Sequence, residues 1–219
     1  MNICLIGYGI PSLILANILS NKNIKISIFD DKKYKNKFST RTLGITKNNI
    51  NFLKKHKINL ENSIWSINNI KIFNESQKNK EILNFGPVDH KFFSIIKNSQ
   101  FVDLLKKKIK KNKLIQIIKN KKKTFYNSII KNKHEFDLVI NFDENNKISK
   151  EIFFRRQEKN YNSLAYTTLI NHQKFDNRLA YQVFTKMGPI AFLPCSNNET
   201  SIVFSVIKEF RNINENEII

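Results

Sequence analysis

The sequence predicts an α/β protein that begins with a βαβ unit and ends in a mainly antiparallel sheet. Residues 1–30 pass from a buried apolar run through a glycine turn and an apolar helix to a second strand. From Tyr161 onward, β segments follow one another without an intervening helix. The first pattern is typical of a Rossmann-like dinucleotide-binding domain, and the second of a separate antiparallel sheet.

The turn of the βαβ unit has residues that suit the pyrophosphate of a dinucleotide. Gly7 allows a tight turn after the strand 3–6, and Gly9 lets the backbone approach a phosphate. Pro11 fits the first turn of the following helix, whose free amides and dipole attract anions. We therefore expect a phosphate-binding loop, with an ordinary βαβ unit that binds no nucleotide as the alternative.

Two further positions complete this pattern. Ser12 stands where the dinucleotide fingerprint has its third glycine, which normally permits close packing of helix and strand. Asp30 ends the second predicted strand, 24–30, where a carboxylate would accept hydrogen bonds from an adenosine ribose.

The composition limits the class of protein. In a chain of 219 residues, 41% hydrophobic residues are enough to bury a core. The net charge of +20 would suit nucleic acid or an acidic membrane, but lysine is over-used throughout the chain and no nucleic-acid motif accompanies it. We therefore expect no nucleic-acid partner, although a general attraction to anionic lipid stays open.

Cysteine and histidine usage indicates neither disulfides nor a metal site. Cys4 and Cys195 form no CxxC pair, and the 4 histidines lack ligand spacing. No run approaches about 20 apolar residues, and the N-terminus lacks the features of a signal peptide. We expect a cytoplasmic protein, with peripheral association at the inner face of the membrane as an open alternative.

Hydrophobic periodicity predicts the remaining elements. One helix is expected around Ile50 and Leu53, and a second from about Asn98 with Phe101, Leu104, Leu105 and Ile109 toward the core. A loop is expected at 144–147. Strands are expected at 69–74, 114–118, 124–130, 136–143, 163–170, 179–185, 190–193 and 201–206.

Three blocks together resemble the flavin-dependent aromatic hydroxylases, above all the ubiquinone-biosynthesis hydroxylases of the para-hydroxybenzoate hydroxylase superfamily. The first block is Gly7-Tyr-Gly-Ile-Pro-Ser12 with Asp30. The second, Arg41-Thr-Leu-Gly-Ile-Thr46, is similar to the family's Arg-x-x-Ala-Leu-Ser block. The third and most specific, Gly188-Pro-Ile-Ala-Phe-Leu-Pro194, is similar to the family's Gly-Pro-(Ile/Leu)-Ala-x-Leu-Pro segment.

The resemblance implies two domains and a set of site residues. An FAD-binding domain would comprise residues 1–66 and 97–150, and an inserted, β-rich substrate domain residues 67–96 and 151–219. The implied FAD contacts are Gly7, Gly9, Ser12, Asp30, Arg41 and Asp143. The implied substrate-side residues are Gly188 and Pro189, and no catalytic residue is assigned, because the cofactor performs the chemistry.

The resemblance also implies an activity. An FAD-dependent monooxygenase of this kind would use NAD(P)H as reductant and O₂ to hydroxylate a phenolic ring that bears a polyprenyl tail. Peripheral association with the membrane, or with a complex for ubiquinone biosynthesis, would follow from such a substrate.

The sequence departs from the family at three points. Phe142-Asp143-Glu144 replaces the family's Ala-Asp-Gly, and Val183 stands where arginine is common. Family members are nearly twice as long, and their Gly-Asp-Ala-Ala-His block is missing from these residues. We therefore expect the C-terminal part of the family fold to be absent, and residues 1–219 alone neither to hold FAD tightly nor to hydroxylate a substrate.

Three other functions stay open at this point. The chain could be a non-catalytic remnant with a flavoprotein-like fold. A nicotinamide-dependent oxidoreductase without flavin would need the βαβ unit but not the third block. A nucleic-acid binder would rest on charge alone.

Overall fold

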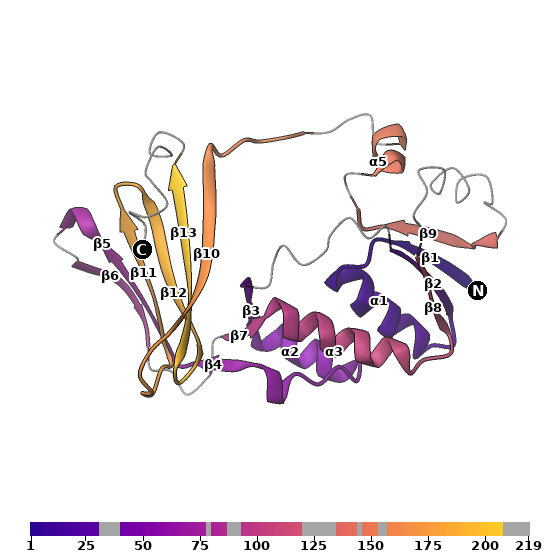
Figure 1. Cartoon of the computed structure of the whole chain (residues 1–219), viewed down its shortest axis with the longest axis horizontal. Helices are drawn as coiled ribbons and strands as arrows, with labels where there is room; N and C mark the ends of the chain where they lie inside the picture. Colours follow the sequence, from indigo (N-terminus) through magenta and orange to yellow (C-terminus); the bar gives the residue numbers. More distant parts are fainter. Residues whose placement is uncertain are drawn as a thin grey trace. The chain divides into compact units, whose positions relative to one another are not determined.

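The computed structural model describes residues 1–30, 40–77, 80–86, 93–119, 135–143, 146–152 and 157–207 (Figure 1). The chain forms two compact units, Met1–Lys37 with Gln100–Glu158 and Phe38–Ser99 with Lys159–Ile219. The first contains a parallel sheet and the second contains two sheets that are mainly antiparallel, so the predicted fold class is confirmed. The assignment of a cofactor domain and a substrate domain stays a prediction.

The expected strand at 124–130 lies outside the described residues, as do Glu144 and Asn145 of the expected loop.

The first unit is built on a four-stranded sheet in the order β8-β2-β1-β9, here called the parallel sheet, because every pairing in it is parallel. Its strands are β1 (Asn2–Ile6), β2 (Lys25–Asp30), β8 (Ile115–Lys119) and β9 (Leu138–Asn141). Ile3, Cys4, Leu5 and Ile6 of the central strand β1 are all buried, as is typical of a parallel strand covered on both faces. This burial raises the pKa of the Cys4 thiol to about 12, so the thiol stays protonated at neutral pH.

Three helices accompany this sheet. They are α1 (Ile10–Ser20), α3 (Asn98–Lys110), which begins in the second unit, and α5 (Lys147–Ile152). The predicted stripe of α3 is confirmed, since Phe101, Leu105 and Ile109 are buried and Leu104 is half-buried. α1 packs against β1 and β2.

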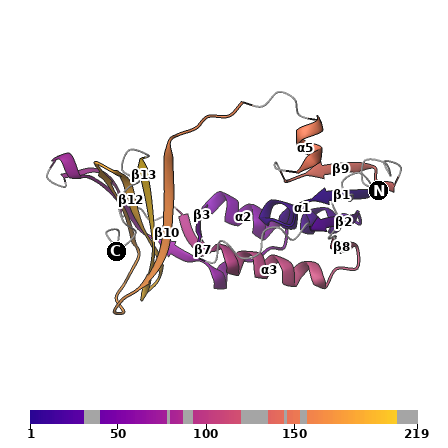
Figure 2. The same cartoon turned by 45° about the horizontal axis from the view of Figure 1, so that its top comes forward.

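The short helix α5 was not predicted: its first residue, Lys147, was assigned to a loop and the rest of it had no assignment. It lies beside β9 in the views of Figures 1 and 2. Ile148 of α5 joins Cys4, Ile6 and Phe29 in one buried cluster. α5 therefore covers the face of the parallel sheet to which these alternate residues point.

The second unit contains a large sheet of six strands in the order β10-β13-β12-β11-β5-β6. Its strands are β5 (Asn69–Asn74), β6 (Lys80–Phe85), β10 (Ser163–Asn171), β11 (Leu179–Thr185), β12 (Gly188–Ser196) and β13 (Glu199–Ile207). All neighbours in it are antiparallel except β11 and β5, which are parallel. The strands predicted after Tyr161 are confirmed, and β12 is longer than the predicted 190–193.

A small sheet of three antiparallel strands, in the order β3-β7-β4, accompanies the large sheet. Its strands are β3 (Thr42–Thr46), β4 (Trp65–Ile67) and β7 (Phe93–Lys97), and none of them was predicted. The helix α2 (Lys47–Lys55) follows β3, where the Thr46 hydroxyl accepts a hydrogen bond from the Asn49 amide. Two short 3₁₀ turns, Glu61–Ser63 and Glu75–Gln77, complete the unit.

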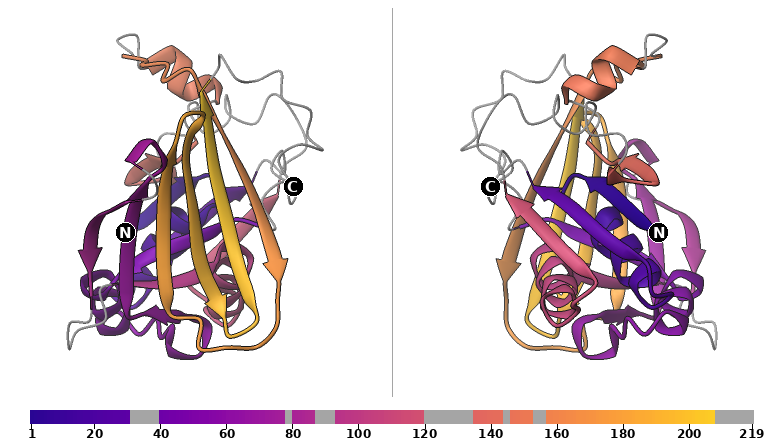
Figure 3. Two further views of the ribbon diagram at one scale, coloured as in Figure 1. Left: turned by 90° about the vertical axis from the view of Figure 1, so that its left-hand side faces the viewer. Right: turned by 90° about the vertical axis from the view of Figure 1, so that its right-hand side faces the viewer.

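The two sheets of this unit share an apolar core. Ile67 and Ile95 of the small sheet pack with Ala180 of the large sheet. The Thr42 hydroxyl donates a hydrogen bond to the Ser201 hydroxyl at 3.0 Å between the oxygens. We call this side of the large sheet its inner face and the opposite side its outer face, which the left panel of Figure 3 shows.

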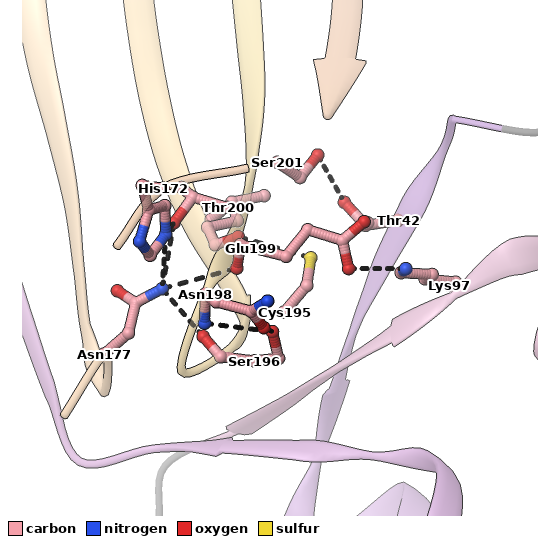
Figure 4. A network of polar contacts seen from close by, with 11 residues as sticks. Thr42, Lys97, His172, Asn177, Cys195, Ser196, Asn198, Glu199, Thr200 and Ser201 are labelled. Carbon is pink, nitrogen blue, oxygen red and sulfur yellow. Dashed lines mark hydrogen bonds and ion pairs between the residues drawn. The ribbon is translucent and has the colours of Figure 1, made fainter. Parts of the chain in front are cut away.

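A polar network closes one end of the large sheet (Figure 4). The amide of Asn177, a buried residue, donates to the Ser196 carbonyl and the Thr200 hydroxyl, each at 2.9 Å. The indole N–H of Trp65 donates to the backbone carbonyl of Asn177 at 2.6 Å. Because a buried amide without partners is costly, this network fixes the segment before β11 against the hairpin of β12 and β13.

Gly188 occupies a backbone position that no other residue fits. Its φ is +136°, and a Cβ there would overlap the carbonyl oxygen of Ser205. The Thr185 hydroxyl donates to the Gly188 carbonyl at 2.7 Å and closes the hairpin of β11 and β12. Gly188 is therefore required by the folding of the large sheet itself.

Gly188→Ala should destabilise the second unit by about 2–4 kcal/mol, because the new Cβ combines backbone strain with overlap of a carbonyl. Urea unfolding followed by fluorescence of Trp65 measures this effect within the unit. Gly44→Ala is the matched control, since its Cβ would meet side chains and no backbone atom: Phe93 at 3.3 Å and Ile95 at 4.0 Å. Equal losses for the two variants would contradict this account.

Candidate functional site

The turn between β1 and α1 is held in place by its first glycine. Gly7 has a φ of +102°, and its N–H donates to the Phe29 carbonyl of β2 at 2.9 Å. A Cβ on Gly7 would lie 3.4 Å from the Cβ of Phe142 and 3.6 Å from the amide nitrogen of Asp143. The turn thus lies in close contact with the segment after β9, and only glycine combines this φ with this approach.

Open space surrounds the second glycine. Gly9 precedes α1 in an extended conformation, and a Cβ there would meet only Pro11 Cδ, at 3.8 Å. No side chain caps the helix, and its first turn contains no acidic residue. The backbone amides and the positive end of the helix dipole are therefore not compensated by a carboxylate of this turn, as an anion-binding loop requires.

Ser12 lies in the first turn of α1 and is fully buried. Its hydroxyl has no hydrogen-bond partner, which is costly for a buried polar atom. A small side chain suits close packing of helix and strand, which is the role of the third glycine in the fingerprint. Its assignment as a cofactor contact stays a prediction.

Asp30 ends β2 beside the glycine turn, because Phe29 of β2 is aligned with Ile6 of β1. The side chain of Tyr8, between the two glycines, interacts electrostatically with this carboxylate. Burial, and secondly the negative charge of Asp30, raise the pKa of the Tyr8 phenol. The ammonium of Lys106 on α3 lies 5.3 Å from the centre of the Tyr8 ring.

A polar network positions Asp143 on the other side of the turn. The Asp143 amide donates to the side-chain oxygen of Asn141 at 3.0 Å, and the Ser149 hydroxyl donates to the Asp143 carbonyl at 2.9 Å. The side-chain oxygen of Asn146, a buried residue, accepts from the Ser149 amide at 2.8 Å and caps α5. The backbone of Asp143 is thereby held against Gly7.

The structure thus brings Gly7, Gly9, Ser12, Asp30 and the backbone of Asp143 to one edge of the parallel sheet. This is the carboxyl end of β1, β2 and β9, where ligands of open α/β sheets bind. Sequence reasoning missed Tyr8, although its position between the two glycines was a signal. It also missed Lys106, for which the sequence has no local signal, since α3 contains several lysines of the same kind.

The other predicted site residues belong to the second unit. Arg41 precedes β3 and is exposed, and its carbonyl accepts a hydrogen bond from the Asn98 amide at 2.9 Å. Pro189 is half-buried opposite Phe184. Val183 lies opposite Ile190, so it belongs to the outer face of the large sheet.

The residues of the glycine turn fit a dinucleotide such as FAD. Beside Gly9 there is room for a phosphate, the N-terminus of α1 offers uncapped amides, and a carboxylate follows β2 where a ribose would lie. Among the described residues, no three His, Cys, Asp or Glu side chains come together as metal ligands. No helix in the described part of the chain is long and apolar enough to cross a membrane.

Comparison with solved structures shows the fold. No protein-family model matches the sequence, and a search of curated proteins gives no match. The p-nitrophenol 4-monooxygenase PnpA from Pseudomonas putida is similar with a TM-score of 0.73 and 9% identity, over 99% of this chain and 59% of that one. PqsL, a probable FAD-dependent monooxygenase from Pseudomonas aeruginosa, has a TM-score of 0.71 and 10% identity, over 95% of this chain and 61% of that one.

A third similar structure is CtdE, which was solved in complex with FAD. Its TM-score is 0.65 and its identity 16%, over 98% of this chain and 61% of that one. The chain therefore spans about three fifths of these proteins, between 59% and 61% of their length. At this identity the likeness establishes that the chain has the fold found in FAD-dependent monooxygenases.

Asp30→Asn should lower the pKa of Tyr8, because the substitution removes the negative charge that helps to raise it. The pKa should stay above the ordinary value of 10.0, since burial is the larger cause. Titration of the tyrosine ¹³Cζ resonances measures it, with the Tyr8 signal assigned through Tyr8→Phe. Asp137→Asn, at an exposed residue just before β9, should leave the Tyr8 pKa unchanged. An unaltered Tyr8 pKa in Asp30→Asn would show that the two side chains do not interact.

Proposed function

We propose that this chain supplies the dinucleotide-binding loop and the substrate sheet of an FAD-dependent aromatic-ring monooxygenase. The observation that carries the proposal is the glycine turn at the edge of the parallel sheet, within a fold shared with PnpA and PqsL. The resemblance of three sequence blocks to flavin-dependent aromatic hydroxylases supports the same activity.

The chain's own residues would hold the adenosine and pyrophosphate half of the cofactor. The backbone at Gly7 and Gly9 and the free amides of α1 would receive the pyrophosphate, and Asp30 would accept hydrogen bonds from the ribose hydroxyls. Tyr8 and Lys106 would line the same region. Bound FAD would supply the redox chemistry, with NAD(P)H as reductant and O₂ as oxidant.

The inner face of the large sheet suits an uncharged ring. Beyond the core with the small sheet, its strands present Ala165, Gln182, Phe184, Ala191 and Val203, as the cross-strand register places them. None of these side chains is charged, and the ring of Phe184 is 42% exposed. In the described strands of the large sheet, the register also places Lys80 of the edge strand β6 and Glu199 of β13 on this face, and Glu199 is paired with Lys97. Moving a neutral, apolar ring from water onto the five uncharged side chains costs little hydration free energy, whereas a carboxylate would find no cation among those five.

The finer proposal follows from this face and from the resemblance of Gly188–Pro194 to the ubiquinone-biosynthesis hydroxylases. The substrate would be a phenolic ring that bears a polyprenyl tail.

Gly9→Val should weaken FAD binding at least about 10-fold, because the valine side chain would fill the open space at the turn. Titration of FAD into the chain, followed by quenching of flavin fluorescence, gives both dissociation constants. ADP should compete with FAD and riboflavin should not, since the loop contacts the half of the cofactor that riboflavin lacks. If Gly9→Val bound FAD like the parent while it remained folded, the loop would not be the cofactor site.

Neutral phenols should stimulate NAD(P)H oxidation more than phenols that bear a carboxylate. The protein expressed from its full coding sequence and loaded with FAD would be assayed with a 2-prenylphenol and with 4-hydroxybenzoate. Hydroxylated product, identified by mass spectrometry, separates hydroxylation from unproductive oxidation. A clear preference for 4-hydroxybenzoate would contradict the neutral-ring proposal but leave the FAD site standing.

A further inference from the structure

The outer face of the large sheet is apolar. At one end it is covered by the segment 172–178, whose Asn177 amide donates to the Thr200 hydroxyl. Five side chains of this face are large, hydrophobic and more than a third exposed. They are Leu164 (45%), Tyr166 (36%), Ile170 (39%), Leu179 (39%) and Tyr181 (36%). A sheet with one face on a core normally presents polar residues on the other, so this pattern needs an explanation.

The register shows that these residues form one surface. Tyr166 lies opposite Phe204 on β13, and Phe204 lies opposite Ile190 on β12. Tyr181 on β11 lies opposite Phe192 on β12, and their rings stack with centroids 4.5 Å apart. Since directly opposite residues point to the same side of a sheet, an apolar band runs across β10, β13, β12 and β11. Phe204 and Val206 of β13 are buried within this band, and its exposed side chains belong to β10 and β11.

The charges of this face cancel. In the described strands of the large sheet, the cross-strand register places only Lys71 and Glu81 of the charged residues on the outer face. These two form an ion pair of 2.8 Å between nitrogen and oxygen. The chain as a whole has a net charge of +20, which makes most approaches between two copies repulsive. The outer face is therefore the surface on which two copies could meet without opposing like charges.

From these observations we infer that the outer face of the large sheet is the interface of a homodimer. The four strands of the apolar band have seven to nine residues, reach about 30 Å and lie about 4.8 Å apart, so the band has an area of at most about 580 Å². Stable dimers bury about 800 Å² on each partner, so the band would form the apolar centre of such an interface. Two such faces pack about 10 Å apart with their strands nearly aligned, and the aromatic side chains interdigitate.

An acidic membrane surface fits this face less well. Anionic lipid is held by lysines around an apolar patch, but the only lysine that the register places on the outer face is already paired with Glu81. Binding to anionic lipid and dimerisation also respond to salt in opposite ways. Screening weakens the attraction between a basic protein and anionic lipid, whereas it relieves the repulsion between two copies of a chain with a charge of +20.

Sedimentation velocity of the chain tests the inference. The dimer fraction should grow between about 1 and 100 μM protein and should increase when NaCl is raised. Tyr181→Lys should weaken dimerisation at least about 10-fold, because two added ammonium groups would be buried together in the interface. Leu164→Lys, which disturbs no ring stacking, should do the same if Tyr181→Lys proves poorly folded by circular dichroism.

Phe184→Lys is the matched control, since Phe184 is 42% exposed on the same strand as Tyr181 but on the inner face. It should leave dimerisation unchanged. A monomer at the highest concentration would overturn the inference, and so would equal effects of Tyr181→Lys and Phe184→Lys. If the chain were monomeric and co-sedimented with phosphatidylserine vesicles, and if Tyr181→Lys abolished this binding, the outer face would be a lipid-binding surface. That result would also overturn the dimer inference. Each of these outcomes is independent of FAD binding and so of the proposed function.

Discussion

The backbone at Gly7 is the constraint on which the first unit depends. Its positive φ turns the chain out of β1, its N–H is taken up by the Phe29 carbonyl of β2, and its missing side chain admits the segment around Phe142. One residue thus joins three strands of the parallel sheet at their carboxyl ends. The position of Gly9 and the direction of α1 follow from this turn.

The two glycine positions of this fold illustrate two different uses of a missing side chain. At Gly188 the space is filled by the Ser205 carbonyl, so glycine is required for packing within the large sheet. At Gly9 the φ is ordinary and the space is open, so packing does not explain the glycine. Open space beside an uncapped helix terminus is what a ligand with phosphates needs. The geometry therefore favours a binding role for Gly9 and a structural role for Gly188.

Local patterns were enough to predict the elements whose residues alternate or recur regularly. β1, α1, β2 and the four strands after Tyr161 belong to this group, and so does the buried stripe of α3. β3, β4, β6 and β7 were missed. β3, β4 and β7 are stabilised by pairing that is distant in sequence, and all six residues of β6 are exposed, so no pattern of burial marks it. The parallel pairing of β5 with β11 has no local signal either.

The candidate site, like the fold, was predictable only where its residues follow a local pattern. Its glycines and Asp30 follow a spacing that can be read from one short segment, but Tyr8 and Lys106 meet only because α3 packs near the turn. The polar network of Asn141, Asn146 and Ser149 also escaped prediction, because asparagine is common throughout this chain and the three residues come from a strand, a loop and a helix. Side chains that act through tertiary contacts have no signature in a single sequence.

The most direct test of the central claim is a map of FAD binding by backbone amide resonances in a ¹⁵N-labelled chain. The account predicts that the largest shifts on addition of FAD fall on Gly7, Gly9, Ser12 and Asp30, with smaller shifts at Asp143. Riboflavin should leave these resonances in place. Shifts spread over exposed lysines, or absent at the turn while FAD is bound, would contradict the claim that this turn holds the cofactor.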